Sequence, residues 1–172
     1  MDHYVLQVPL IGPRLGSDGR PFISPGSSGD RPLRGSMACW HAAACMVSSY
    51  YRGVPRTSLP PPWPQEQPLD GQAVSVLARR EGLQPVQTPP DGLTADNVLA
   101  LLRTYGPLWV AGRYMEDQPG ARHAVVITGV SGDSVLYNDP AEPRCKRRGW
   151  PWIWGNLLPL PVALLAGDTS RP

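Results

Sequence analysis

The hydrophobic pattern of this chain changes from helical to strand-like at Gly106-Pro107. In the helices predicted between Ser36 and that point apolar residues recur at helical spacing, and beyond it they form short runs that are typical of strands. Two of these runs, His123–Val130 and Ser134–Asn138, are joined by Ser131-Gly132-Asp133, which predicts an antiparallel hairpin. Helices followed by an antiparallel sheet indicate an α+β domain.

The segment Met37–Arg52 is predicted to be the central helix of the domain, because it contains neither glycine nor proline. Its polar members His41, Ser48 and Arg52 occupy one narrow stripe, and nearly all of its other residues are apolar. A helix with so thin a polar face is mostly buried. We expect His41 to be a surface or partly exposed residue on that stripe.

The remaining elements are predicted from periodicity, capping and turn residues. The strand expected at 4–11 should lie at a sheet edge, because Pro9 has no N–H to donate to the ladder of a central strand. Tryptophans at alternate positions near the C-terminus favour a final strand with aromatics on one face. In chain order we expect an edge strand at 4–11, the central helix between Ser36 and Gly53, helices at 70–81 (ended by Gly82) and from Thr94 to Tyr105, a strand at 108–111, and a last strand containing Trp150, Trp152 and Trp154.

Two stretches have compositions that favour irregular structure. Residues 12–35 are rich in Gly, Pro, Ser and Asp, which predicts a long surface loop. Residues 54–69 contain six prolines and must be extended or turn-like. A chain of 172 residues fits one domain, so we expect 1–172 to form a single domain that includes both stretches.

Composition and charge argue against several classes of protein. A net charge of +2 does not suggest a nucleic-acid partner, and we interpret the short basic cluster Lys146-Arg147-Arg148 as a solvated loop. No run approaches the roughly 18 to 20 apolar residues of a membrane-spanning helix. The segment Met1–Pro9 lacks a basic region followed by a long apolar stretch, so we expect synthesis in the cytoplasm without a cleavable signal. Export would then require a specialised secretion system.

The candidate catalytic residues follow from the few cysteines and histidines. Cys39 lies in the first turn of the central helix, where free N–H groups and the helix dipole favour a thiolate. His3 lies at the N-terminus, where a catalytic geometry is hard to hold, and His41 does not face Cys39 on the helix. His123 opens an apolar strand, so it is the best-placed general base.

The histidine base needs an acceptor that orients it, and this acceptor should come from the neighbouring strand. Asn138 and Asp139 both end that strand. Because side chains alternate across a strand, only one of the two can face His123. The alternation alone leaves both candidates open.

No metal site is expected from the cysteines and histidines of the central helix. Cys39, His41 and Cys45 do not converge on one helical face, and the chain contains no Cys-x-x-Cys pair. We interpret Cys45 as a packing residue, and Cys145 lies in a basic segment without a catalytic set around it.

Several motifs of the chain resemble those of small bacterial papain-like cysteine peptidases, a group that includes bacteriocin-processing and plant-pathogen effector peptidases. The matching segments are Met37–Val47 with its Cys39-Trp40 pair, Gly106–Val110, His123–Val130, Val135–Pro140 and, more weakly, Val8-Pro9-Leu10. The resemblance implies a papain-like fold in which Cys39 is the nucleophile, His123 the base and Asp139 the third triad member. Papain itself uses an asparagine, which keeps Asn138 as the alternative.

The chain departs from this family pattern at the oxyanion site. Relatives usually carry a glutamine some six residues before the cysteine, whereas position 33 is leucine here and no glutamine lies between Val8 and Cys39. Gln7 is our candidate for the missing donor, with the backbone N–H of Cys39 as the other.

The resemblance implies a cysteine peptidase that cleaves target proteins without a metal or organic cofactor. By analogy we expect a secreted effector or toxin, with a neutralising immunity protein as partner and no nucleic-acid or membrane partner. One alternative is another thiol acyl-transfer enzyme, namely a deamidase, a transglutaminase or a peptidoglycan amidase. The other is a non-catalytic binding domain on the same scaffold.

Overall fold

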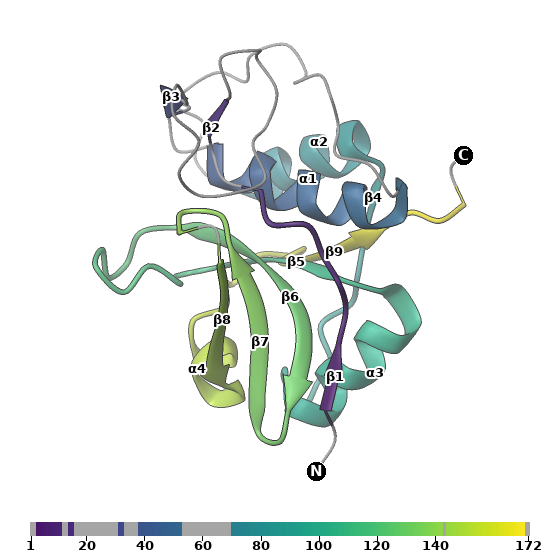
Figure 1. Ribbon diagram of the computed structural model, residues 1–172, viewed down its shortest axis with the longest axis vertical. Helices are drawn as coiled ribbons and strands as arrows, with labels where there is room; N and C mark the ends of the chain where they lie inside the picture. Colours follow the sequence, from purple (N-terminus) through teal and green to yellow (C-terminus); the bar gives the residue numbers. More distant parts are fainter. Residues whose placement is uncertain are drawn as a thin grey trace.

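The computed structural model describes residues 3–11, 14–15, 31–32, 38–52, 70–142 and 144–170. They form an α+β structure with an antiparallel sheet in the order β4-β9-β5-β6-β7-β8, and β1 pairs with β6 (Figure 1). The strands of this sheet are β1 (His3–Val5), β4 (Leu83–Pro85), β5 (Leu108–Gly112), β6 (His123–Ser131), β7 (Ser134–Asp139), β8 (Arg144–Gly149) and β9 (Leu164–Gly167). The helices are α1 (Ala38–Arg52), α2 (Gly71–Glu81), α3 (Ala95–Tyr105) and α4 (Trp150–Gly155).

The sheet separates two hydrophobic cores, because side chains of its central strands alternate between its faces. Trp109 and Ala111 of β5 pack with α1 and α2, whereas Leu108 and Val110 of the same strand pack with α3 and α4. Figure 1 shows α1 and α2 together on one side of the sheet, with α3 and α4 on the other. The predicted arrangement of a buried central helix on an antiparallel sheet is confirmed.

Helices α2 and α3 begin and end within one residue of the predicted positions, and their caps explain why. Asp70 accepts a hydrogen bond from the Ala73 backbone N–H at 2.8 Å, and Thr94 caps α3 in the same way through Asn97. Gly82 ends α2 with a φ of 67°, a left-handed conformation that glycine adopts without a Cβ clash.

The prediction of a C-terminal strand containing the three tryptophans is wrong, because Trp150–Gly155 forms the short helix α4. Pro151 has no N–H for a ladder but suits the first turn of a helix, where that N–H would have no partner. Trp152 lies against the rings of Tyr114 and Tyr137. The last strand of the sheet is instead β9, an apolar segment between β4 and β5.

Two further expectations about the sheet need correction. The basic cluster Lys146-Arg147-Arg148 lies within strand β8 rather than in a loop, because it pairs with β7 along that whole strand. The N-terminal edge strand is shorter than predicted and covers only His3–Val5. The last hydrogen bond to β6 is from the Leu6 N–H to the Thr128 carbonyl, and the chain from Gln7 to Pro9 is not part of the ladder.

His41 is not on the surface, contrary to the prediction, and only 5% of it is exposed. The polar stripe of α1 faces α2 here: His41 contacts Glu81, and Ser48 Oγ donates to the Glu81 carbonyl at 3.0 Å. Only Arg52, at the end of the stripe, is exposed.

The long loop predicted at 12–35 and the connection predicted at 54–69 lie largely outside the described residues, as do Ser36 and Gly53. Within the first of them, β2 (Arg14–Leu15) and β3 (Arg31–Pro32) form a small antiparallel pair. None of the described helices is long and apolar enough to span a bilayer.

Candidate active site

Cys39 is the second residue of α1 and is partly buried. The next residue, Trp40, is inserted into the core between α1 and the sheet. Its backbone carbonyl accepts a hydrogen bond from Trp109 Nε1 of β5 at 3.1 Å. The N-terminal turn that carries Cys39 is therefore fixed to the middle of the sheet by both packing and a hydrogen bond.

His123 is the first residue of β6 and is 1% exposed. It lies opposite Gly112 in the strand register, at the end of the sheet where β5 ends and β6 begins. Its Nε2–H donates to Asp139 Oδ1 at 2.7 Å, and its ring also interacts with the side chain of Cys39. The histidine thus interacts with both of the predicted partners, which come from different elements.

The strand register explains why Asp139, rather than Asn138, contacts His123. Asn138 lies opposite Val126, so Asp139 points to the other face of the hairpin, the face of Val125 and His123. Asn138 Nδ2 donates instead to the carbonyl of Val8 at 3.2 Å. The structure therefore brings Cys39, His123 and Asp139 together and directs Asn138 away from them.

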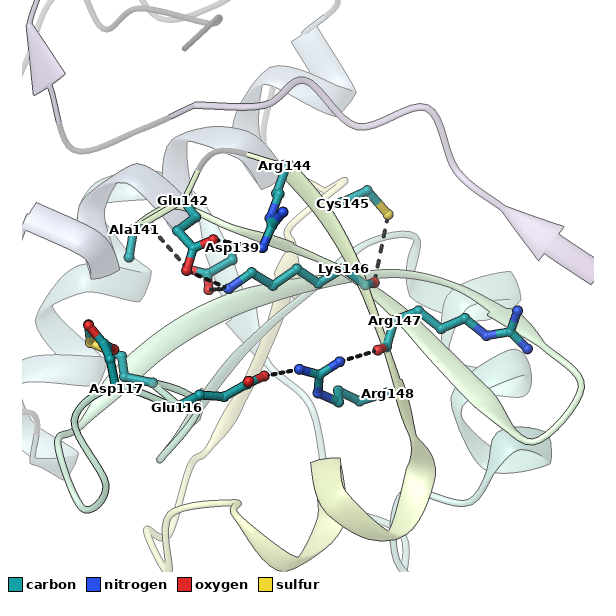
Figure 2. A pocket seen from close by; sticks show the side chains of 11 residues that line it. Glu116, Asp117, Asp139, Ala141, Glu142, Arg144, Cys145, Lys146, Arg147 and Arg148 are labelled. Carbon is teal, nitrogen blue, oxygen red and sulfur yellow. Dashed lines mark hydrogen bonds and ion pairs between the residues drawn. The ribbon is translucent and has the colours of Figure 1, made fainter. Parts of the chain in front are cut away.

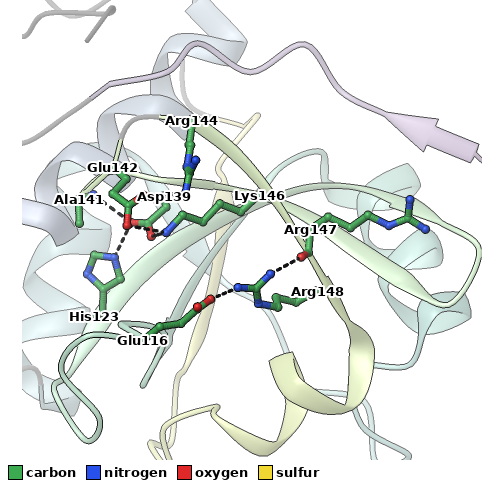
Figure 3. A network of polar contacts seen from close by, with 9 residues as sticks. All are labelled: Glu116, His123, Asp139, Ala141, Glu142, Arg144, Lys146, Arg147 and Arg148. Carbon is green, nitrogen blue, oxygen red and sulfur yellow. Dashed lines mark hydrogen bonds and ion pairs between the residues drawn. The ribbon is translucent and has the colours of Figure 1, made fainter. Parts of the chain in front are cut away.

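Three groups donate hydrogen bonds to the carboxylate of Asp139, as Figure 3 shows. Besides His123, these donors are the Ala141 backbone N–H at 2.9 Å to Oδ1 and Lys146 Nζ at 2.8 Å to Oδ2. Burial raises the pKa of Asp139, but the contacts with His123 and Lys146 outweigh this effect, and the pKa lies below its usual value. Asp139 is therefore a carboxylate at neutral pH.

Opposing effects also set the pKa of His123. Burial lowers it, but the hydrogen bond to Asp139 and the interaction with Cys39 raise it more, to about 9. The imidazole ring therefore carries a proton at neutral pH. A protonated histidine beside a cysteine is the arrangement that activates a thiolate nucleophile.

A pocket of about 490 Å³ opens on the Asp139 side of the site (Figure 2). Lys146 crosses it between Asp139 and Glu142, with its Nζ atom 3.2 Å from Glu142 Oε1. The outer wall is charged: Arg144 pairs with Glu142, and Arg148 pairs with Glu116. Burial lowers the pKa of Lys146, but the two carboxylates raise it above its usual value, so this side chain is a permanent cation.

Sequence reasoning missed Lys146 as a member of the site. It lies on the face of β8 that also carries Arg144, and it reaches Asp139 diagonally across the β7–β8 ladder. The signal that could have indicated it is that side chains alternate between the two faces of a strand at 144–149. From the sequence alone the segment is interpreted as a loop, because it contains so many basic residues. The predicted oxyanion donor Gln7 is an exposed residue of the segment between β1 and Val8.

Because the pKa of His123 is raised in the folded protein, the stability of the fold should depend on pH. In the unfolded chain its pKa is near 6.5, and in the folded protein it is about 9. The stabilisation is complete below pH 6.5 and disappears as the pH rises through 9, and this shift corresponds to on the order of 3 kcal/mol. We expect the free energy of unfolding in urea to decrease from pH 6.5 to pH 9. The His123→Gln variant should show a flatter profile, and parallel profiles for the two proteins would contradict the prediction.

A family model described as papain-like cysteine protease AvrRpt2 matches residues 30–152. The matched region contains Cys39, His123 and Asp139, together with α1 and strands β5 to β8. No curated protein sequence matches the chain significantly.

Proposed function

Because this chain belongs to the family of the papain-like cysteine protease AvrRpt2, we propose that it hydrolyses peptide bonds through a triad of Cys39, His123 and Asp139. The observation that carries the proposal is the position of His123, a buried ring that is hydrogen-bonded to Asp139 and interacts electrostatically with Cys39. No metal or organic cofactor takes part in this chemistry.

The proposed reaction begins with a thiolate–imidazolium pair. The Cys39 thiolate attacks the carbonyl carbon of the scissile bond, and the carbonyl oxygen becomes an oxyanion. When this intermediate collapses, the C–N bond breaks and the His123 imidazolium gives its proton to the leaving amine. Water then attacks the thioester and its proton passes to His123, so that the acid product leaves and the thiolate–imidazolium pair is restored.

The two ring nitrogens of His123 have different roles in this proposal. Nε2–H is held by Asp139 Oδ1 at 2.7 Å, which fixes the rotation of the ring. Nδ1 is the nitrogen left to exchange protons with Cys39 and with the leaving amine. Asp139 acts by keeping its negative charge against the ring, which favours the imidazolium form.

Lys146 is expected to act on the rate through Asp139. Its ammonium group neutralises the second carboxylate oxygen and holds the carboxylate in place. We expect Lys146→Met to decrease kcat about tenfold, with little change in KM, because the position of the Asp139 carboxylate would be less well defined. Arg147→Met, an exposed neighbour in the same strand, is the matched control. Equal effects of the two changes on kcat would contradict this role.

We propose Gln7 as the side-chain donor for the oxyanion, with the Cys39 backbone N–H as the second donor. In support, the next residue, Val8, accepts a hydrogen bond from Asn138, the neighbour of Asp139, and packs against the same core as Cys39. Gln7→Ala should then reduce kcat on the order of 100-fold. Gln72→Ala, an exposed glutamine on α2, should have no effect. Full turnover in Gln7→Ala would exclude this role.

A peptide library tests the proposed reaction without knowledge of the natural substrate. Peptides derived from a whole proteome are incubated with the wild-type chain and with Cys39→Ala, and the products are identified by mass spectrometry. New peptide termini that depend on Cys39 would support the peptidase. Conversion of glutamine to glutamate without chain cleavage would indicate a deamidase instead, and no Cys39-dependent product would favour a binding domain.

The cellular role is proposed by analogy alone. We propose that the chain is an effector that a specialised secretion system delivers to a competitor or host cell, and that the producing cell holds a neutralising protein. The expected result is that expression of the wild-type chain harms recipient cells whereas Cys39→Ala does not. Equal harm from both chains would reject a role that depends on the peptidase.

A further inference from the structure

A second group of chemically reactive side chains lies between α1 and α2, apart from the triad. His41 and Cys45 are one helical turn apart on α1, and Glu81 is the last residue of α2. All three are buried, with exposed fractions of 5%, 1% and 1%, respectively. Figure 1 shows α1 and α2 side by side above the sheet. His41 and Cys45 on α1 approach Glu81 on α2, with all three donor atoms close together.

The donor atoms of this group have the spacing of ligands around one small cation. His41 Nε2 is 3.6 Å from Cys45 Sγ and 3.4 Å from Glu81 Oε1, and all three donor atoms lie within 4.8 Å of one another. A tetrahedral Zn²⁺ with Zn–S of about 2.3 Å and Zn–N or Zn–O of about 2.0–2.1 Å places its S and N ligands about 3.6 Å apart, and its N and O ligands about 3.3 Å apart. Both separations are close to these edges, but Cys45 Sγ is also 3.9 Å from His41 Nδ1 and so lies beside the ring; the imidazole must rotate to direct Nε2 at a cation shared with Cys45.

The chemistry of the three side chains points to the same cation. Thiolate, imidazole and carboxylate are the ligands that Zn²⁺ takes in proteins, and a mixture of soft sulfur and harder oxygen does not suit Mg²⁺ or Ca²⁺. Two ligands at i and i+4 on one helix face are a common zinc arrangement. A divalent cation would also place positive charge beside the buried carboxylate of Glu81.

We propose that His41, Cys45 and Glu81 form a structural zinc site that joins α1 to α2. A water molecule or the second Glu81 oxygen completes the coordination, and Cys45 releases its proton on binding. The hydrogen bond from Ser48 Oγ to the Glu81 carbonyl holds the end of α2 against α1, which keeps the third ligand in place. From the sequence we expect no metal site, because only the cysteines and histidine of the central helix are compared. The third proposed ligand, Glu81, comes from α2.

The zinc ion would act on the structure and not on the reaction. Cys39 is not a member of this group, and its own interaction is with His123. The ion would fix α1, whose first turn carries the nucleophile, to the neighbouring helix. Metal binding should therefore raise the melting temperature, because zinc binds only the folded site.

The experiment isolates Cys45 as the only thiol of the chain. The double variant Cys39→Ala/Cys145→Ser is treated with Co²⁺, which shows a thiolate charge-transfer band in the near ultraviolet and intense visible bands when it is tetrahedral. The matched control Cys39→Ala/Cys45→Ala also keeps one thiol, the exposed Cys145. We expect both sets of bands in the first variant at equimolar Co²⁺, their loss on addition of Zn²⁺, and no bands in the control.

Binding without a spectroscopic probe is measured on the wild-type chain by native mass spectrometry and thermal unfolding. We expect equimolar zinc, a decrease of the melting temperature on chelation, and zinc affinity at least about tenfold weaker in Glu81→Gln, which keeps the shape of the side chain. Circular dichroism verifies that each variant folds. A folded double variant without cobalt bands, bands of equal strength in the control, or a melting temperature that neither zinc nor chelator changes would each overturn the proposal.

Discussion

Cys39→Ala is expected to reduce kcat/KM for peptide cleavage by at least about 10⁴-fold. The loss should be this large because no other cysteine can replace the nucleophile. Cys45 is buried between α1 and α2, and Cys145 lies on the edge strand β8 with its side chain exposed. The measurement uses a peptide found in the library experiment, with initial rates at a saturating and a low concentration.

Cys145→Ser is the matched control for this prediction, since it also removes one thiol. We expect its kcat/KM to remain within a factor of about two of the wild type, because exposed substitutions away from the site have small effects. Comparable cleavage by Cys39→Ala and the wild type, with both chains folded, would show that another group is the nucleophile.

Asp139→Asn is expected to decrease kcat on the order of 10³-fold, with no large change in KM. The amide keeps the shape of the carboxylate but loses the negative charge that favours the imidazolium form of His123. The pKa of His123 is about 9 in the wild type, and the hydrogen bond to Asp139 is a main cause of its increase. The alkaline limb of the pH–rate profile, near pH 9 in the wild type, should therefore move to lower pH in the variant.

Asn138→Ala separates this role from that of the neighbouring residue. Its side chain bonds the Val8 carbonyl rather than His123, so we expect a small decrease in melting temperature and no shift of the pH–rate profile. A larger loss of kcat in Asn138→Ala than in Asp139→Asn would make Asn138 the orienting residue, as the corresponding asparagine is in papain.

The elements that sequence reasoning located well are those with strong local signals. Helix α2 begins after the N-cap Asp70 and ends at Gly82, and both residues act through contacts within one turn of the chain. Helix α4 could not be predicted in this way. Tryptophans at alternate positions are compatible with a strand, but they are equally compatible with a single helical turn that packs against other aromatic rings. The choice depends on Tyr114 and Tyr137, which are distant in sequence.

The candidate site shows the same division between local and distant information. Cys39 and His123 could be proposed because the chain has few cysteines and histidines, and the family resemblance favoured Asp139 over Asn138. The contacts of Lys146 with Asp139 and of His41 with Glu81 could not be predicted. Each joins elements whose relative position depends on how the whole sheet and its helices pack.

The hydrogen bond from Trp109 to the Trp40 carbonyl has a consequence for when the proposed site is assembled during folding. The proposed nucleophile belongs to a helix, whereas the proposed base and orienting carboxylate belong to a hairpin much later in the sequence. A nascent or partly unfolded chain therefore holds a cysteine and a histidine that do not meet, and its thiol is chemically ordinary. The proposed triad is therefore complete only when the Trp40 side chain lies in the core and α1 is docked on β5.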